Sequence, residues 1–262
     1  MNGIKPTESI IAYIDFLGTS KKIEQDDDNS YLTFLKSIYD FIEKELNNIN
    51  KSYANEHYIK EIKIRSFSDN ILFSVSANVN NMRLVSALDE IIKICSAIQA
   101  KALKEGILIR GGIALDDIYI NKHFAYGKGL LKVLEMEEKI AHYPRIILDN
   151  QLNIKCKDYY ESNKKTTVDF DNIRYIDFYR ATPLTDDDLK QCRKSLNVLK
   201  RKNKNNLRHM SKIQWAIQHY NNNLSYLSYQ KDILGSLFPL KELPSPIQLE
   251  LDFEKKEITN AQ

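Results

Sequence analysis

The chain has 262 residues, 43% of them hydrophobic and 28% charged, which is enough to bury the core of one large domain or of one domain with an appendage. Its net charge of +3 is too small to indicate a nucleic-acid partner. The three cysteines lack metal-ligand spacing, no signal-peptide segment is seen, and no apolar run approaches the roughly 18 residues of a membrane span. We therefore expect no membrane association and a soluble protein in the reducing cytoplasm.

Two aspartates are placed where strands are predicted. Asp15 lies at the end of the strand predicted at 9–16, and Asp69 lies between strands predicted at 60–66 and 71–76. Burying a carboxylate is costly unless a cation or a hydrogen-bond donor neutralises it. Two such carboxylates on neighbouring strands would form a site for a hard cation, whereas the alternative is that either aspartate is a turn residue or a helix cap.

The remaining pattern alternates strands and helices up to residue 180 and is helical after it. Further strands are predicted at 107–114, 118–120, 145–148, 166–169 and 174–178, and helices at 32–46, 81–104 and 127–142, with a helix start at 185, a helix at 210–234 and a strand-like segment at 247–253. This order predicts an α+β fold, with a mixed or antiparallel sheet and helices packed against one face.

Three segments in this order resemble the catalytic core of the class III nucleotidyl cyclases. The matching residues are Asp15 with Phe16 and Gly18, then Asp69, then the run Arg110-Gly111-Gly112-Ile113. Residues 124–137 resemble the glycine-initiated helix of that family, and 143–149 resemble the strand after it. The resemblance covers about residues 9–180 and is closer to compact bacterial forms, including the pyrimidine cyclases of Pycsar antiphage systems. It implies a ferredoxin-like catalytic domain at 9–180, and 181–262 would be a C-terminal helical extension and tail.

The resemblance also implies the chemistry. Asp15 and Asp69 would hold two Mn²⁺ or Mg²⁺ ions together with the main-chain carbonyl of Phe16, since these ions prefer oxygen ligands. The turn at Gly18 and Thr19 would offer backbone N–H groups to the substrate phosphates. Such enzymes act as homodimers, with each active site composed of residues from both subunits.

Base selection is predicted from Arg65, four positions before Asp69, where adenylate and guanylate cyclases place a lysine or glutamate. A guanidinium offers only donors, which suits the carbonyl oxygens of uracil first and the O2 and N3 acceptors of cytosine second. UTP is therefore the expected substrate, with CTP as the second choice. The alternative is that Arg65 is an edge-strand residue that pairs with Glu61 or faces solvent.

The chain departs from the family pattern at several positions. The ribose-orienting asparagine and the transition-state arginine of purine cyclases correspond here to Leu131 and Glu135, which cannot replace them. Lys128 or Lys132 could supply the missing positive charge, unless both are surface lysines. The triphosphate-binding lysine has no clear counterpart, and the candidates are Lys164, Lys165 and Arg174.

The basic stretch 190–208 could contact phosphates, but a solvated helix face packed beside the core is the more ordinary interpretation. The resemblance together with Arg65 favours a pyrimidine nucleotidyl cyclase. The resemblance to the Pycsar cyclases implies that its product is a second messenger for a separately encoded effector in antiphage defence. The alternatives are a catalytically silent nucleotide-binding signalling module and a purine (adenylate) cyclase. A polymerase palm is disfavoured because no basic primer-binding groove is evident.

Overall fold

The structure is a computed structural model that describes residues 5–24, 26–53, 62–77, 81–234 and 243–248. The described strands are β1 (Thr7–Phe16), β2 (Lys63–Phe67), β3 (Asn70–Ser76), β4 (Ile109–Ile120), β5 (Ala125–Tyr126), β6 (Ile146–Leu148), β7 (Thr166–Val168) and β8 (Arg174–Ile176). The described helices are α1 (Thr19–Glu24), α2 (Ser30–Tyr53), α3 (Asn81–Lys104), α4 (Lys128–Glu135), the π-helix η1 (Met136–Ile140), α5 (Asn150–Lys155), α6 (Lys157–Ser162), α7 (Phe178–Ala181), α8 (Asp186–Lys202) and α9 (Leu207–Leu234).

The strands form one mixed sheet in the order β2-β3-β1-β4-β6-β8-β7, and β5 pairs with β4 as a short arm. Among the described strands, only β4 and β6 pair in parallel, and the other pairs are antiparallel. The predicted α+β class with a mixed sheet is therefore confirmed.

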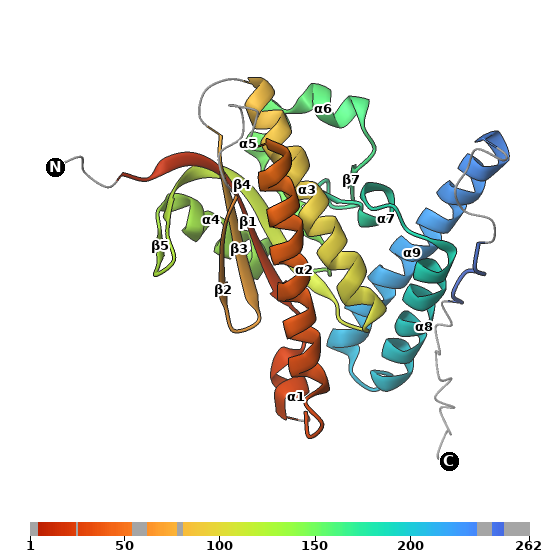
Figure 1. The fold of residues 1–262 in the computed structure, drawn as a ribbon. Helices are drawn as coiled ribbons and strands as arrows, with labels where there is room; N and C mark the ends of the chain where they lie inside the picture. Colours follow the sequence, from red (N-terminus) through yellow and green to blue (C-terminus); the bar gives the residue numbers. More distant parts are fainter. Residues whose placement is uncertain (1–4, 25, 54–61, 78–80, 235–242, 249–262) are drawn as a thin grey trace, which may run out of the picture.

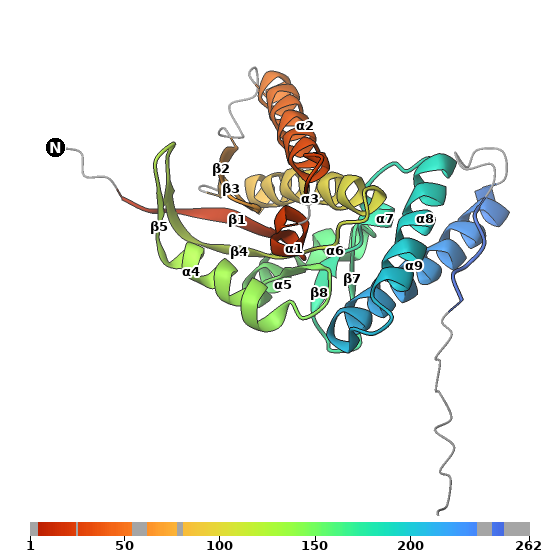
Figure 2. The ribbon, with the colours of Figure 1, turned by 90° about the horizontal axis from the view of Figure 1, so that it is seen from below.

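Side chains alternate between the two faces of β1, and each face buries against helices. Ile10 and Ile14 lie in the larger hydrophobic cluster with Leu88 of α3. Ile11, on the opposite face, packs in a smaller cluster with Val133 of α4. Figure 2 shows α2 and α3 on one side of the sheet and α4 on the other. Helices therefore cover both faces of the sheet, whereas the sequence analysis predicts helices on one face, because β1 is apolar on both faces. This division places Asp15, which alternates with Ile14, on the face that α4 covers in part.

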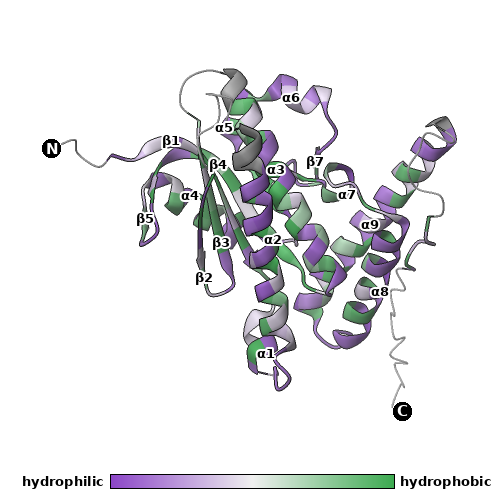
Figure 3. Cartoon of the chain, viewed as in Figure 1, coloured by the Kyte–Doolittle hydropathy of each residue, from purple (hydrophilic) through white to green (hydrophobic). Residues whose placement is uncertain are grey.

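The C-terminal helices α8 and α9 pack side by side at the end of the sheet away from β5 (Figure 1). Helix α8 begins at a capping box in which Thr185 and Asp188 satisfy each other's backbone N–H groups, as the acidic helix start predicts. Leu189 of α8 and Tyr220 of α9 are fully buried in the same cluster as the sheet. Figure 3 shows hydrophobic residues along the central strands and a mixed pattern along both helices.

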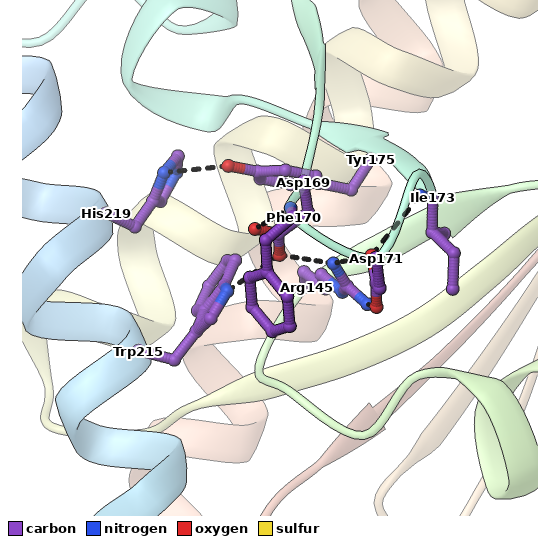
Figure 4. Close-up of polar contacts among 8 residues, drawn as sticks. All are labelled: Arg145, Asp169, Phe170, Asp171, Ile173, Tyr175, Trp215 and His219. Atoms are coloured by element: carbon purple, nitrogen blue, oxygen red, sulfur yellow. Dashed lines mark hydrogen bonds and ion pairs between the residues drawn. The ribbon is translucent and has the colours of Figure 1, made fainter.

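A buried arginine fixes α9 to the sheet. Arg145, just before β6, has no solvent exposure and forms ion pairs with Asp169 and Asp171 at the β7–β8 turn. Trp215 of α9 donates its indole N–H to Asp169 at 2.8 Å, and its ring stacks on Tyr143 at 6.0 Å between centroids. Figure 4 shows Arg145, Asp169, Asp171 and Trp215 converging from the sheet and from the helix. The desolvation cost of a buried guanidinium is offset here by two carboxylates and by aromatic faces.

Several element boundaries differ from the sequence prediction. The strands predicted at 107–114 and 118–120 are one strand, β4, because β1 pairs across the polar Asp116 and Asp117 between them. The helix predicted at 127–142 divides into the α-helix α4 and the π-helix η1. Of the strand-like segment at 247–253, residues 249–253 lie outside the described part of the chain, and Ile247 is buried but is not in a strand.

Candidate active site

The sheet register brings the two aspartates together. Asp15 of β1 pairs with Asn70 of β3, and Asp69 immediately precedes Asn70 in the two-residue turn after β2. Ser68 in this turn has a φ of 56°, a left-handed conformation that a tight hairpin requires and that small polar residues tolerate. The hairpin therefore directs Asp69 to the end of β1 where Asp15 lies.

Asp15 is held in a half-buried position against a cation. Its side chain is 19% exposed, and Arg110 of β4 donates from Nε to Oδ2 at 3.3 Å. Burial raises the pKa of Asp15 above its ordinary value, the Arg110 charge opposes this, and the negative charge of Asp69 raises it again. The carboxylates are thus close enough to repel each other, which favours a proton or a cation between them.

Glu137 is a third acidic residue at this site, which the sequence analysis missed. It lies in η1 and forms an ion pair with the same Arg110 that contacts Asp15. Burial raises the pKa of Glu137 from 4.5 to about 7, the Arg110 charge opposes this, and the Asp15 charge adds to the rise. A single turn of π-helix such as η1 is often found at functional sites. A sequence feature that could have revealed it is the spacing from Val133: Glu137 follows four residues later and so lies on the apolar face of the predicted helix, where a carboxylate is unexpected.

Hydrogen bonds of Thr19 hold the turn after β1. Gly18 has a φ of 82°, in the left-handed region that favours glycine. The buried Thr19 donates its hydroxyl to the carbonyl of Phe16 at 2.7 Å and lies 2.8 Å from the hydroxyl of Tyr31. The carbonyl oxygen of Phe16 keeps one lone pair for another partner. The turn thus presents its backbone beside the aspartates in a fixed conformation.

The donor set around Asp15 is suited to a hard divalent cation. Asp15, Asp69 and the Phe16 carbonyl supply only oxygen atoms, which Mg²⁺ and Mn²⁺ prefer. Burial raises the pKa of Asp15, the Arg110 charge opposes this, and the Asp69 charge raises it again, so a further cation would stabilise the ionised form. In the described part of the chain, no group of three or more His, Cys, Asp or Glu residues has the arrangement of a metal site. A cation here would thus use two carboxylates, main-chain oxygen and water.

Arg65 lies on the same sheet face as Asp15, at the outer strand β2. It pairs with Leu72 of β3, which pairs with Tyr13 of β1, two residues from Asp15. Its guanidinium donates to the carbonyl of Lys122 at 2.8 Å. This bond ties β2 to the turn before β5 and uses one of the five N–H donors of an arginine.

The two lysines predicted on the glycine-initiated helix have different surroundings. Lys128 is exposed at the first position of α4, after Gly127. Lys132 forms an ion pair with the nearly buried Asp149 at 2.7 Å. Asp149 also caps α5 by accepting from the backbone of Gln151. Lys132 is therefore engaged within the chain, whereas Lys128 forms no ion pair with a described residue.

No protein-family model and no curated protein matches the sequence. Solved structures with similarity include the adenylyl cyclase CyaB from P. aeruginosa, at a TM-score of 0.43 and 13% identity over 66% of this chain and 94% of that one. A guanylyl cyclase domain from the aquatic fungus Blastocladiella emersonii has a TM-score of 0.47 and 12% identity over 66% and 96%. An adenylate/guanylate cyclase/hydrolase from Silicibacter pomeroyi has a TM-score of 0.36 and 16% identity over 66% and 96%. None of the helices in the described part of the chain has the length and apolarity needed to cross a membrane.

Proposed function

We propose that the chain is a metal-dependent nucleotidyl cyclase that converts a pyrimidine nucleoside triphosphate, UTP in preference to CTP, to the 3′,5′-cyclic monophosphate and pyrophosphate. The observation that carries this proposal is the convergence of Asp15 and Asp69 at the end of β1, beside Arg110. The ordered sequence motifs that resemble class III cyclases agree with it. The proposed catalytic domain is 9–180, with 181–262 as the extension.

Asp15, Asp69 and the Phe16 carbonyl would hold two Mg²⁺ or Mn²⁺ ions. Bound ions lower the pKa of the ribose 3′-hydroxyl and neutralise the leaving pyrophosphate. The 3′-oxygen attacks the α-phosphorus, the bond from that phosphorus to the bridging oxygen breaks, and the hydroxyl proton passes to water. The Gly18 and Thr19 turn would position the phosphates beside these carboxylates.

Arg65 supports a pyrimidine because its remaining donors face the same side of the sheet as Asp15. Donors without acceptors match the two carbonyl oxygens of uracil and leave an amino group unpaired. A purine, as in an adenylate cyclase, remains the alternative substrate. The proposed product is a second messenger for a separately encoded effector in antiphage defence, in keeping with the resemblance to the Pycsar cyclases.

Exposed apolar side chains support the proposed homodimer. Phe67 on the β2–β3 hairpin is 79% exposed, Tyr126 on β5 is 68% exposed and Leu131 on α4 is 69% exposed. Phe67, two residues after Arg65, lies on the sheet face against which α4 packs, so a partner that covers this face would bury the exposed side chains beside α4. In the proposed dimer, Lys128 would reach the carboxylates of the partner subunit.

A catalytically silent nucleotide-binding module is the second candidate. The observation that favours it is that Arg110 already contacts both Asp15 and Glu137, while Lys132 is paired with Asp149. The same binding surface would then signal through its partner contacts alone.

Incubation of the purified full chain with each of the four nucleoside triphosphates and Mn²⁺ tests the proposal. A cyclic pyrimidine monophosphate and an equal amount of pyrophosphate are expected. A cyclic purine product would assign a purine cyclase, and nucleotide binding without any product would favour the silent module.

A further inference from the structure

A cavity of about 860 Å³ lies where the turn after β1, the end of α3 and the helices α8 and α9 meet. Leu17 and Gly18, which follow the proposed metal-binding strand, form part of its wall. The cationic residues of its lining are Lys21, Lys22, Lys104, Lys194, Lys202 and Lys212. Glu105 is the one acidic residue among the described lining residues. The cavity is therefore strongly basic.

Most of these lysines are not neutralised by the described part of the chain. Lys104 forms an ion pair with Asp188 at 2.5 Å, whereas the other five lysines form no salt bridge with a described residue. Burial and then the charge of Lys202 lower the pKa of Lys22. Like charges thus converge on a shared space, an arrangement that an anionic ligand would stabilise.

Lys212 connects the cavity with the proposed active site. Its pKa is lowered by burial and then by the Arg110 charge, and raised by the charges of Asp15 and Glu137. Lys212 lines the cavity and is also within electrostatic range of Asp15 and Glu137. Lys212 lies three residues before Trp215, so the contact of Trp215 with Asp169 sets its position along α9.

The three cationic residues that the sequence analysis gave as candidates for triphosphate binding contact other side chains. Lys165 pairs with Asp89 at 2.5 Å, and Lys164 lies over the ring of Tyr226 at 5.7 Å. Arg174 lies over the ring of Tyr160 at 4.5 Å. In the cavity, Lys104 pairs with Asp188 and Lys22 lies over the ring of Tyr31 at 5.8 Å. Among the described residues, no ion-pair or ring partner is found for the other lysines of the lining, Lys21, Lys194, Lys202 and Lys212.

We propose that this cavity binds an oligophosphate, the triphosphate tail of the nucleotide, and that α8 and α9 supply its cations through Lys202 and Lys212 of the same chain. Ammonium groups bind phosphate oxygens as point charges, and several of them suit a ligand with several negative charges. The turn at Leu17 and Gly18 places such a tail next to the carboxylates that would hold the metal ions. This inference rests on the proposed function for the identity of the nucleotide, but not for the binding of the phosphates.

Equilibrium binding of inorganic tripolyphosphate to the full chain, measured by calorimetry without metal, tests the site independently of catalysis. The Lys202→Gln/Lys212→Gln variant should bind tripolyphosphate about tenfold or more weakly than wild type, because charged hydrogen bonds are lost. The Lys202→Arg/Lys212→Arg variant should keep most of the affinity. Arg201→Gln/Lys204→Gln removes two cations from the same region outside the cavity lining and should bind like wild type.

Equal affinity in all four proteins, or no binding by wild type, would overturn the inference. Tighter lysine-dependent binding of a short single-stranded RNA than of tripolyphosphate would also overturn it, in favour of a nucleic-acid site. Tripolyphosphate should compete with UTP for binding, and its failure to do so would refute the assignment to the nucleotide tail. Lysine-dependent binding with competition, but with no cyclic product from any nucleotide, would support the phosphate site and reject the proposed cyclase.

Discussion

The indole N–H of Trp215 donates to the carboxylate of Asp169 at 2.8 Å, and this bond joins α9 to the turn between β7 and β8. The same carboxylate pairs with the fully buried Arg145. These contacts fix α9 to the sheet. Lys212, three residues before Trp215 on α9, is within electrostatic range of Asp15 and Glu137.

Trp215→Phe should lower the free energy of unfolding by about 2 kcal/mol, since it removes a hydrogen bond to a charged group and some buried ring. Urea denaturation monitored by circular dichroism measures this change. Tyr229→Phe, at a position that is 62% exposed on the same helix, is the control and should have almost no effect. Equal stability of the two variants would show that the Trp215 bond does not anchor α9.

Glu137 should make stability depend on pH. Its pKa rises from 4.5 to about 7 on folding, so the folded chain binds more protons than the unfolded chain between these values. The contribution of Glu137 is therefore fully present below about pH 4.5 and is lost as the pH rises through about 7. Glu137→Gln should flatten the fall in stability over this window relative to wild type. An identical pH profile for the two proteins would contradict the raised pKa.

Arg65 should determine the order of substrate preference. Arg65→Lys keeps the charge but loses the planar donor set, and kcat/KM for UTP should fall by the equivalent of about 1–3 kcal/mol. Arg65→Glu should lower it further, because the uracil carbonyls would face a carboxylate. The measurement compares all four nucleoside triphosphates under the same Mn²⁺ concentration. The same ranking in the three proteins would make Arg65 a strand residue that only binds the Lys122 carbonyl.

A composite site predicts complementation between subunits. Mixing an Asp69→Ala chain with a Lys128→Ala chain should restore part of the activity that each homodimer lacks, because one site of the mixed dimer is intact. Mixing Asp69→Ala with Asp15→Ala is the control and should restore nothing. Lys132 is unsuited to this experiment, because its removal would leave the nearly buried Asp149 without its cation. A mixture with Lys128→Ala that stays inactive would place the whole site in one subunit.

Local patterns in the sequence were sufficient to predict much of the fold. The helix predicted at 81–104 has the bounds of α3, because its apolar spacing is regular and Gly106 adopts a left-handed φ of 72° just beyond it. The strands on either side of Asp69 were predicted as a hairpin, and their register brings Asp69 to Asp15.

Features that depend on distant contacts were not predictable in this way. Glu137 reaches Arg110 from the π-helix η1, which replaces the last part of the α-helix that the spacing of apolar residues predicted. Arg145 looks like an ordinary strand residue until two aspartates and the ring of Trp215 surround it. The sequence analysis interpreted the basic stretch 190–208 as a solvent-exposed helix face. Lys194 and Lys202 line the cavity beside the turn after β1 because of how α8 and α9 pack, which the sequence does not show.

Formation of a cyclic nucleotide by wild type, Asp15→Asn and Asp69→Asn tests the central claim most directly. Product and pyrophosphate are measured by mass spectrometry with Mn²⁺ and UTP or CTP, and Asp117→Asn, an exposed aspartate of β4, is the control. The account predicts cyclic product from wild type and the control, and none from either site variant, while circular dichroism shows all four proteins folded. Product from a folded Asp15→Asn or Asp69→Asn chain at the wild-type rate would contradict it.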